Sequence, residues 1–429
     1  MRNYILDLIT SKEEKQATIQ GWIYRHRVSG NMAFAIIRDS TGILQCTIKK
    51  DKVDSKSWKN AEEIYIESSV IVSGKLVKDE RAPGGYELQV SDFQTINNGE
   101  PFPISKDLSD EFLLDVRHLW IRSQKMTNIF RLRHHTVNYL REFFNSKGFY
   151  ELPPPIITGS ACEGGSTLFE FDYFGEKAYL SQSGQLYAEA YIFSLEKVYV
   201  LAPSFRAEKS RTIRHLAEYW HLEPEMAFYD WKQNMDLQEE MIVEVVQNLI
   251  KNHSSLLESV GQDPEVLKKA SAPFERMDYE KAVERINELG GKMEYGEDFG
   301  ADEEALLTKG YEKPLFVHHF PKDIKAFYMP EDPNKPGTVL CNDLLAPNGH
   351  GEIIGGSERI WKYDELMQRI EENKLNPKDY QWYIDLRKYG SVPHSGFGLG
   401  IERLVKWVLN LNHIRDAIPF PRTINRCYP

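Results

Sequence analysis

The chain has 429 residues, of which 41% are hydrophobic and 27% are charged, and this length suits two or three domains of about 150 residues each. No apolar run approaches the ~18 residues that a membrane-spanning helix needs, and the first residues lack the basic-then-apolar pattern of a secretory signal. The four cysteines form no CxxC pair, which argues against a disulfide framework and a zinc knuckle. We therefore expect a cytoplasmic globular protein without a membrane partner.

The net charge of −11 at first disfavours a nucleic-acid partner, but the acidic excess is confined to one part of the chain. Residues 1–100 hold 14 basic and 14 acidic residues, whereas residues 101–429 hold 39 and 50. Arg25, His26 and Arg27 cluster in the neutral part. The overall charge is therefore compatible with a local surface for nucleic acid.

Residues 17 to about 95 contain five short segments rich in β-branched and aromatic residues, which are typical of strands. The segments are 17–27, 32–40, 43–50, 69–77 and 85–93. Tight turns are predicted at 39–42 and 83–85, and a short helix near 58–64. This pattern suits a small Greek-key barrel of the OB type, although an SH3-like barrel or an unrelated β-module fits the strand number as well.

After a Gly-, Pro- and Ser-containing stretch at 97–106, the pattern changes to long helices and strands. Apolar residues at helical spacing predict a helix over about 129–143, with Gly148 as its cap, and a second over 235–258. Strands are predicted around 177–182, 197–203, 221–231 and 351–358. We expect a barrel domain at 1–100, a linker at 101–120, and an α+β domain at 121–429 with an antiparallel sheet flanked by helices.

The segment 205–215 is rich in cations. Arg206 and Glu208 lie two apart on a predicted strand, which places both side chains on one face. A hairpin of this kind offers a guanidinium fork to a phosphate or carboxylate. Taken alone, it is equally well a solvated hairpin with charge pairs.

Two Gly-rich segments follow. In 349–359, Glu352 stands among small residues and Arg359 ends the segment, a composition that suits Mg²⁺ and a polyphosphate but also a strand with a bulge. In 396–403, glycines precede an apolar helix, and a helix start favours anions. Neither segment has the P-loop or the dinucleotide GxGxxG spacing.

The three segments together resemble a known family. FRxE at 205–208, the ending GxGxER at 398–403 and an upstream helix–proline element ending in Pro155 match motifs 2, 3 and 1 of class II aminoacyl-tRNA synthetases. The chain resembles class IIb enzymes over nearly its whole length, and most closely the asparaginyl-tRNA synthetases of compact archaeal-like type. The resemblance implies an OB-fold anticodon-binding domain and a class II catalytic domain.

The resemblance implies a role for each matching residue in the ATP site. Arg206 would contact the α-phosphate and the amino-acid carboxylate, Glu208 the adenine amino group or the tRNA end, and Arg403 the adenine ring. The remaining ATP-binding positions are Arg214 and His215 at the γ-phosphate, Gly400 beside the nucleotide, and Glu352 as the Mg²⁺ ligand. Gly355 stands where aspartyl enzymes have a hydroxyl side chain, so the number of Mg²⁺ ions is left open.

For the amino-acid pocket, the resemblance implies that Glu163, Ser181 and Gln185 bind the α-amino group and that Arg359 binds the side-chain oxygen. Aspartyl enzymes carry a lysine where this chain has Ala188, and Asp where it has Glu223. The first difference removes an attraction for aspartate, and the second adds a repulsion. Both favour asparagine. Lys325 and Phe327 would lie near the substrate.

In the barrel, the resemblance implies that Phe34 stacks on an anticodon base, Gln45 reads a base edge and Arg27 holds backbone phosphate. The alternatives are a core aromatic for Phe34 and a solvent-facing strand residue for Gln45. Pro155 and the preceding helix would form a homodimer interface, although a strand-edge proline in a monomer fits as well.

The sequence thus predicts ATP-dependent activation of asparagine and its transfer to tRNA(Asn), with Mg²⁺ as cofactor and no DNA partner. The nearest rival is an aspartyl-tRNA synthetase, including a non-discriminating form. An asparagine synthetase-like paralogue would lack the barrel, and a non-catalytic RNA-binding paralogue would have lost Arg206, Glu352 or Arg403.

Overall fold

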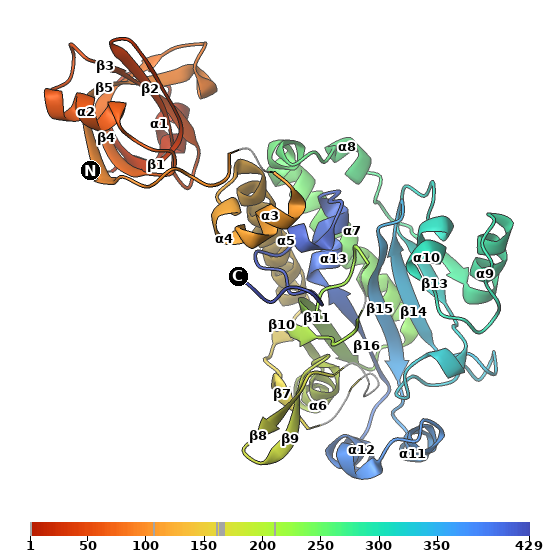
Figure 1. Cartoon of the computed structure of the whole chain (residues 1–429). Coiled ribbons are helices and arrows are strands. Elements are labelled where there is room, and N and C mark those ends of the chain that lie inside the picture. The colour runs from red at the N-terminus through yellow and green to blue at the C-terminus, as the bar shows by residue number, and fades with distance from the viewer. Residues whose placement is uncertain (1, 106–107, 160–161, 163–167, 210–211) are drawn as a thin grey trace. The chain divides into compact units, whose positions relative to one another are not determined.

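The computed structural model describes residues 2–105, 108–159, 162, 168–209 and 212–429, which form two compact units (Figure 1). The units are Met1–Leu113 and Leu114–Pro429, so the division falls inside the stretch 101–120 that was predicted to be a linker. In the described part of the chain, no helix has the length and apolar character required to cross a membrane.

The first unit is a closed barrel with the strand order β1-β2-β3-β5-β4, which confirms the predicted five-stranded barrel. In the strand 32–38, Ala33, Ala35 and Ile37 are buried and alternate with half-buried residues, because successive side chains of a strand point to opposite faces. The elements are α1 (Ile5–Ser11), β1 (Gln16–Ser29), β2 (Met32–Arg38), β3 (Ile43–Lys49), α2 (Ser55–Glu62), β4 (Ser69–Lys78) and β5 (Tyr86–Asn97).

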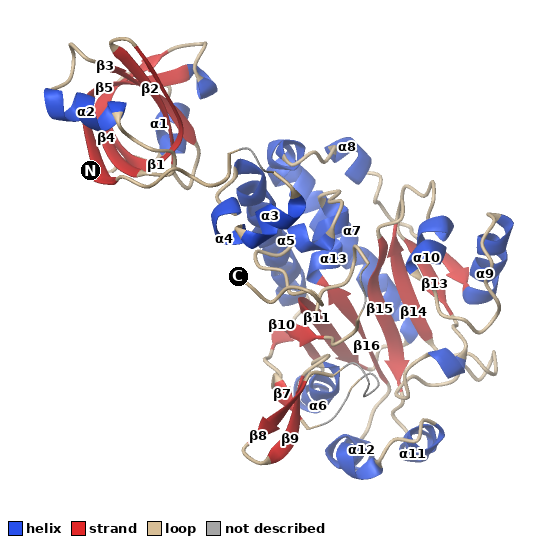
Figure 2. Ribbon diagram, in the orientation of Figure 1, coloured by secondary structure: helices blue, strands red, loops and turns tan. Residues whose placement is uncertain are grey.

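The second unit contains an eight-stranded sheet in the order β12-β13-β14-β15-β16-β11-β10-β6 (Figure 2). Its strands are β6 (Tyr150–Glu151), β10 (Lys197–Phe205), β11 (Glu218–Ala227), β12 (Glu275–Asp278), β13 (Leu315–His318), β14 (Cys341–Ala346), β15 (Gly351–Arg359) and β16 (His394–Gly400).

The strands from β13 to β10 pair antiparallel, as predicted, whereas the edge pairs β12–β13 and β10–β6 are parallel. Each parallel pair is joined by a long connection that contains a helix, which is the crossover that parallel pairing requires. The sheet is therefore mixed at both edges.

Two long helices pack on one face of this sheet. They are α5 (Gln124–Ser146) and α7 (Trp231–Ser259), both close to the predicted helices, and Gly148 follows α5 with φ +78°. Leu222 and Met226 of β11 join the core beneath them, whereas His221 and Glu223 alternate with these residues and face a cavity on the other side. The alternation of β11 thus separates the core face of the sheet from the face that carries the site.

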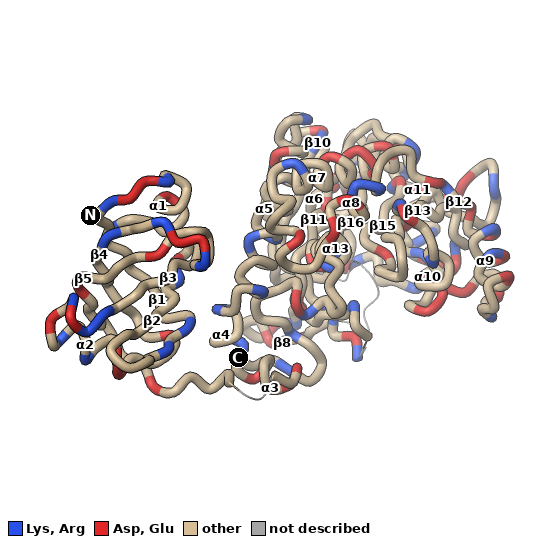
Figure 3. Tube along the Cα trace, turned by 90° about the horizontal axis from the view of Figure 1, so that it is seen from above, with Lys and Arg blue, Asp and Glu red and all other residues tan. Residues whose placement is uncertain are grey.

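The other elements surround this framework, and basic and acidic residues are interspersed along both units (Figure 3). A three-stranded sheet has the order β7-β9-β8, with β7 (Ile157–Thr158), β8 (Glu170–Tyr173) and β9 (Glu176–Leu180). The remaining helices are α3 (Asp110–Asp115), α4 (Arg117–Trp120), α6 (Gln185–Leu195), α8 (Pro264–Leu267), α9 (Tyr279–Glu288), α10 (Ala301–Leu307), α11 (Tyr363–Glu372), α12 (Gln381–Lys388) and α13 (Ile401–Val408).

Candidate active site

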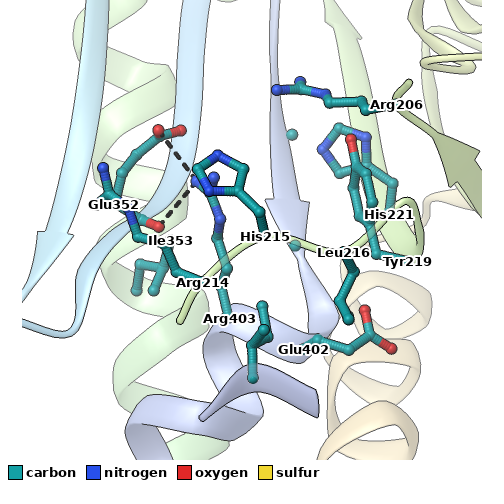
Figure 4. Close-up of a pocket in the computed structure, with 13 residues that line it drawn as sticks. Arg206, Arg214, His215, Leu216, Tyr219, His221, Glu352, Ile353, Glu402 and Arg403 are labelled. Atoms are coloured by element: carbon teal, nitrogen blue, oxygen red, sulfur yellow. Dashed lines mark hydrogen bonds and ion pairs between the residues drawn. The ribbon is translucent and has the colours of Figure 1, made fainter. Parts of the chain in front are cut away.

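A cavity lies over the sheet where β15, β16 and β11 meet the start of α13 (Figure 4). Six of the seven residues predicted to bind ATP line it, and Glu208 is the exception. The predicted residues in the lining are Arg206, Arg214, His215, Glu352, Gly400 and Arg403, and they are joined by Leu216, Tyr219, His221, Ile353, Gly398, Glu402 and Ile414.

The structure corrects the predicted strand placement of Arg206 and Glu208. Strand β10 ends at Phe205, and both residues lie in the loop that follows. The Arg206 amide still donates to the carbonyl of Ala217. The residues that follow, 207–209, have no alternation of buried and exposed side chains that would continue the strand. Loop geometry, and not strand alternation, therefore brings Arg206 to the cavity.

Arg403 and Glu352 form the central ion pair of this cavity (Figure 4). The Arg403 Nη1 lies 3.1 Å from both the carbonyl oxygen and the Oε2 of Glu352. Burial alone would raise the pKa of Glu352, but Arg403, Lys325 and Arg206 outweigh it and lower the pKa to about 2. Glu352 is thus an anion held among three cations.

The two residues predicted at the γ-phosphate differ in their partners. Arg214 forms a two-pronged ion pair with the buried Glu304, which sequence analysis did not single out. Burial, together with Arg403, lowers the pKa of His215, so its imidazole is neutral at pH 7. His215 Nε2 lies 3.8 Å from Glu208 Oε2.

Asp343 of β14 provides a second carboxylate beside Glu352. It pairs with Gly355 in the sheet, and a Cβ at Gly355 would lie 3.3 Å from Glu352 Oε1 and 3.6 Å from Asp343 Oδ1. Burial raises the pKa of Asp343 to about 7; Lys325, whose Nζ lies 2.8 Å away, opposes this rise. Two carboxylates on either side of a residue without a side chain fit a hard divalent cation such as Mg²⁺.

A second cavity shares Arg206, His221, Glu352 and Gly398 with the first. Of the residues predicted to bind the amino acid, Gln185, Arg206, Glu223 and Arg359 line it. The segment 323–329, which includes Lys325 and Phe327, supplies another part of the wall.

Two of the predicted residues, Ser181 and Ala188, do not line this second cavity. Ser181 is buried, and its Oγ donates to the carbonyl of Ser183. Ala188 lies in α6, within an apolar cluster that includes Ile192 and Val200. Glu163 falls outside the described residues.

Glu223 is fully buried at the base of the second cavity. Its carboxylate accepts hydrogen bonds from the Ser183 hydroxyl and from the Gly184 amide, the latter at 2.7 Å, and His221 Nδ1 lies 3.2 Å away. Burial opposes ionisation, but these partners outweigh it and lower the pKa of Glu223. The cavity therefore presents a fixed negative charge.

Arg359 is held by Glu225, a partner that sequence analysis missed. The Arg359 Nη2 and Nε donate to Glu225 at 2.6 and 3.2 Å, and Nη1 donates to Ser357 at 2.6 Å. Burial disfavours the guanidinium charge, but Glu225 outweighs it and raises the pKa of Arg359. The glycines of β16 make room for this arrangement, because a Cβ at Gly396 would collide with the Glu225 carboxylate.

Glu189, which was not predicted from the sequence either, is a buried partner of Gln185 in the wall of the second cavity. Its Oε1 accepts a hydrogen bond from Gln185 at 3.0 Å, and its Oε2 accepts from Arg387 at 2.6 Å and from the Tyr383 hydroxyl at 2.7 Å. His394 Nε2 lies 3.0 Å from the same oxygen. A buried network of this kind fixes the rotamer of the cavity-lining Gln185.

Comparison with known proteins decides the family. The description "tRNA synthetases class II (D, K and N)" matches residues 109–424, and "OB-fold nucleic acid binding domain" matches residues 17–96. The asparagine–tRNA ligase of Thermoplasma acidophilum is 50% identical over 414 residues, which are 96% of each chain, and that of Thermococcus gammatolerans is 51% identical over 426 residues, which are 99% of each. The chain belongs to the asparaginyl branch of the class II tRNA synthetases.

A solved structure agrees with this assignment. The asparaginyl-tRNA synthetase of Pyrococcus horikoshii, complexed with asparaginyl-adenylate, superposes with a TM-score of 0.97 at 48% identity over the full length of both chains. The predicted fold, an OB barrel followed by a class II synthetase domain, is thereby confirmed.

In this member of the synthetase family, the three residues predicted to bind the anticodon share the outer face of the barrel. Arg27 pairs with Phe34 across β1 and β2, and its guanidinium carbon lies 5.3 Å from the Phe34 ring centroid. Phe34 is half-buried and outside the core, which removes the core-aromatic alternative. Gln45 donates to Glu87 at 3.2 Å, so the predicted base-reading amide already has an acidic neighbour.

Pro155 of this synthetase lies in an exposed segment. The neighbouring apolar side chains are also exposed, by 40% at Ile156, 45% at Ile157 and 56% at Tyr150. A run of exposed apolar residues is typical of a protein–protein contact.

Proposed function

We propose that this chain activates L-asparagine with ATP to form asparaginyl-adenylate and pyrophosphate, and then transfers the asparaginyl group to the 3′ end of tRNA(Asn). The observation that carries the proposal is the shared wall of the two cavities, in which Arg206 and His221 border both. An ATP phosphate in the first cavity and an amino-acid carboxylate in the second would meet at this wall. The full-length similarity to asparagine–tRNA ligases supports the same reaction.

Activation requires positioning and charge, and it requires no general base, because the substrate carboxylate is already ionised at pH 7. One carboxylate oxygen attacks the α-phosphorus, a bond to that phosphorus forms, and the bond to the pyrophosphate oxygen breaks. Arg206, at the wall between the cavities, would stabilise the negative charge that builds on the pentacovalent phosphorus. We assign Arg206, Glu208 and Arg403 to this machinery, with Arg403 against the nucleotide base.

Glu352 and Asp343 would hold Mg²⁺, which neutralises phosphate charge when it is bound. Their oxygens are of the type that this ion prefers, and Gly355 leaves space between them. In the nucleotide-bound state, Arg214 and His215 would bind the γ-phosphate, which requires Arg214 to exchange Glu304 for phosphate.

Asparagine selection would rest on two charges at the second cavity. Arg359, oriented by Glu225, donates to the side-chain oxygen of asparagine. The Glu223 carboxylate accepts a hydrogen bond from the asparagine NH₂ group and repels the carboxylate of aspartate. Ala188, at the position where aspartyl enzymes carry a lysine, does not line the cavity and supplies no cation to it. We further propose that Gln185, Ser181 and Glu163 bind or support the α-amino group.

The barrel would bind the anticodon of tRNA(Asn) through Arg27, Phe34 and Gln45. The exposed segment around Pro155 would mediate a homodimer, and the enzyme would act in the cytoplasm.

The direct test is ATP–pyrophosphate exchange with Mg²⁺ and without tRNA, comparing asparagine with aspartate. We expect exchange with asparagine and, at equal concentrations, at least ~10³-fold less with aspartate, because the wrong ligand brings a carboxylate against Glu223. Exchange mainly with aspartate would favour the aspartyl alternative, and no exchange with either would favour a non-catalytic paralogue.

The Arg206→Lys variant tests the shared wall. It keeps a positive charge but loses the planar fork, so we expect exchange to fall by about 10²- to 10³-fold. Lys232→Arg, a basic exchange at an exposed position in the first turn of α7, serves as the matched control and should keep full exchange.

A further inference from the structure

Three potential metal ligands meet at the edge of the sheet, outside both cavities. Asp278 ends β12 and His318 ends β13, and the two residues are direct neighbours in the parallel pair. His319 follows at once. One atom from each side chain lies within 4.8 Å of the others: His318 Nδ1 is 2.9 Å from His319 Nδ1, which is 3.2 Å from Asp278 Oδ2.

An unusual backbone conformation brings the two adjacent imidazoles together. Neighbouring residues of an extended strand direct their side chains to opposite faces. His319 has φ +59°, a left-handed conformation that is uncommon for residues other than glycine. The strand therefore turns between the two histidines, and their Nδ1 atoms face one another. Uncommon backbone conformations of this kind persist where the surrounding structure holds them, and they cluster at functional sites.

Neighbouring side chains contact the ring nitrogen of His319 and the oxygen of Asp278 that would point away from a metal ion. His319 Nε2 lies 3.2 Å from Asp332 Oδ2, at ion-pair distance but without a hydrogen bond, so this carboxylate stands beside the ring nitrogen that would not face the ion. Asp278 Oδ1 accepts from Lys335 Nζ at 2.6 Å and from the Glu280 amide at 3.2 Å, so Oδ2 is the oxygen on the imidazole side. The Trp231 ring covers the pair, with its centroid 4.8 Å from that of His319.

From this geometry we propose that Asp278, His318 and His319 bind one divalent transition-metal ion of the Zn²⁺ type, with a fourth position for water. Two imidazoles and one carboxylate are a donor set that Zn²⁺ uses, and three protein ligands leave the fourth tetrahedral position open. The site is separate from the oxygen-only pair of Glu352 and Asp343 that suits Mg²⁺.

The place of the site suggests what the ion does. The chain runs from His319 directly into the segment 323–329, which lines the second cavity. An ion that ties the end of β13 to Asp278 would fix the start of this segment without contacting the substrate.

The test uses the full chain after treatment with a chelator and dialysis into metal-free buffer. Equilibrium dialysis with Zn²⁺ alone should show about one tightly bound ion per chain, and Co²⁺ in its place should give the visible absorption of a four-coordinate site. Bound Zn²⁺ should also raise the melting temperature of the chain by several degrees.

Four variants locate the ion. His318→Asn and Asp278→Asn, which keeps the side-chain acceptor at the start of α9, should each abolish the Co²⁺ spectrum. Asp332→Asn, which leaves all three ligands in place, should weaken binding by about 10- to 100-fold. His134→Asn is the matched control, because His134 is also adjacent to another histidine but lies on α5.

The melting temperature without metal shows whether each variant is folded. The proposal is overturned if folded His318→Asn and Asp332→Asn bind Zn²⁺ like the unmodified chain, or if the unmodified chain binds no ion. It is also overturned if Glu352→Gln alone removes binding, since the ion would then lie in the ATP cavity.

Discussion

Glu223 is the residue whose exchange should change the substrate preference most directly. Ser183, Gly184 and His221 hold its carboxylate in one orientation, so Glu223→Gln replaces a fixed charge with a neutral amide in the same place. We expect discrimination against aspartate in ATP–pyrophosphate exchange to fall by about 10- to 100-fold, because the repulsion of the second carboxylate is lost.

The control for this experiment is Glu240→Gln, which neutralises an exposed carboxylate on α7. It should leave the ratio of asparagine to aspartate exchange unchanged. If Glu223→Gln also leaves that ratio unchanged, Glu223 does not select the substrate.

The site residues that the sequence predicted belong to recognisable motifs, whereas the site residues that it missed do not. Arg206, Glu352 and Arg403 lie in recognisable segments, and the order of these segments identified the family. Glu225 and Glu189 lie in no motif, and their partners Arg359 and Arg387 are 134 and 198 residues away. A buried carboxylate whose counter-ion is remote in sequence gives no local pattern, so only the folded chain shows it.

At the scale of the secondary-structure element, β16 owes its glycines to the side chains of β11. A Cβ at Gly398 would lie 2.5 Å from His221 Nε2, whereas the atoms nearest to a Cβ at Gly400 belong to Arg403 and lie 3.5 Å away or more. Gly398→Ala should therefore lower the free energy of unfolding by about 1–3 kcal/mol and displace His221 from both cavities. Its expected signature is a lower melting temperature together with weaker exchange.

Gly400→Ala is the matched variant on the same strand, with φ −74° and ordinary contact distances. It should keep the melting temperature within a few degrees and raise the KM for ATP, since the added methyl group enters the first cavity. An equal loss of stability in both variants would contradict the assignment of Gly400 to nucleotide binding.

The contact between α6 and α12 should make the stability of the second unit depend on pH. Burial opposes the ionisation of Glu189, but Arg387 and His394 outweigh it and lower the pKa of Glu189 below 4.5. The stabilisation is thus present above pH ~4.5, the value for the unfolded chain, and is lost as the pH falls towards the lower folded pKa.

Glu189→Gln should cost about 3–5 kcal/mol at pH 7, because it leaves the buried Arg387 without a counter-ion. The difference between the melting temperatures of the two proteins should narrow as the pH falls from 7 to 3.5. Glu142→Gln, on the exposed side of α5, should give a curve parallel to that of the unmodified chain. A constant difference at all pH values would contradict this account.

At the scale of the whole molecule, the two units should separate the two half-reactions. Phe34→Ala in the full chain removes a half-buried ring from the outer face of the barrel and touches neither cavity. We expect ATP–pyrophosphate exchange to be unchanged and kcat/KM for tRNA charging to fall by about 10- to 100-fold, since one stacked base is worth roughly 1–3 kcal/mol.

Tyr65→Ala is the control, because Tyr65 is an exposed aromatic residue of the same unit that lies outside the β1–β2 face. Charging should be normal in this variant. Equal losses in the two variants would indicate a general effect on the barrel and no specific contact at Phe34.

The sequence predicted the barrel strands and the two long helices, but it did not predict the parallel pairing at the two edges of the sheet. The barrel strands and the helices α5 and α7 have clear periodicity, because one side of each packs on a core. β6 and β12 have two and four residues, too few to show a period, and their parallel pairing depends on helices elsewhere in the chain. The loop position of Arg206 was missed for a related reason, since no pattern marks where β10 stops pairing.

The common wall of Arg206, His221, Glu352 and Gly398 has a thermodynamic consequence. Two ligands that touch the same side chains do not bind independently, and each changes the free energy of the other. Linkage makes this effect reciprocal: the factor by which bound asparagine alters the dissociation constant of ATP must equal the factor by which bound ATP alters that of asparagine. Asparagine brings a negative charge to Arg206 and ATP brings several, so the sign of this coupling depends on how far the cations of the wall offset the repulsion between the substrates.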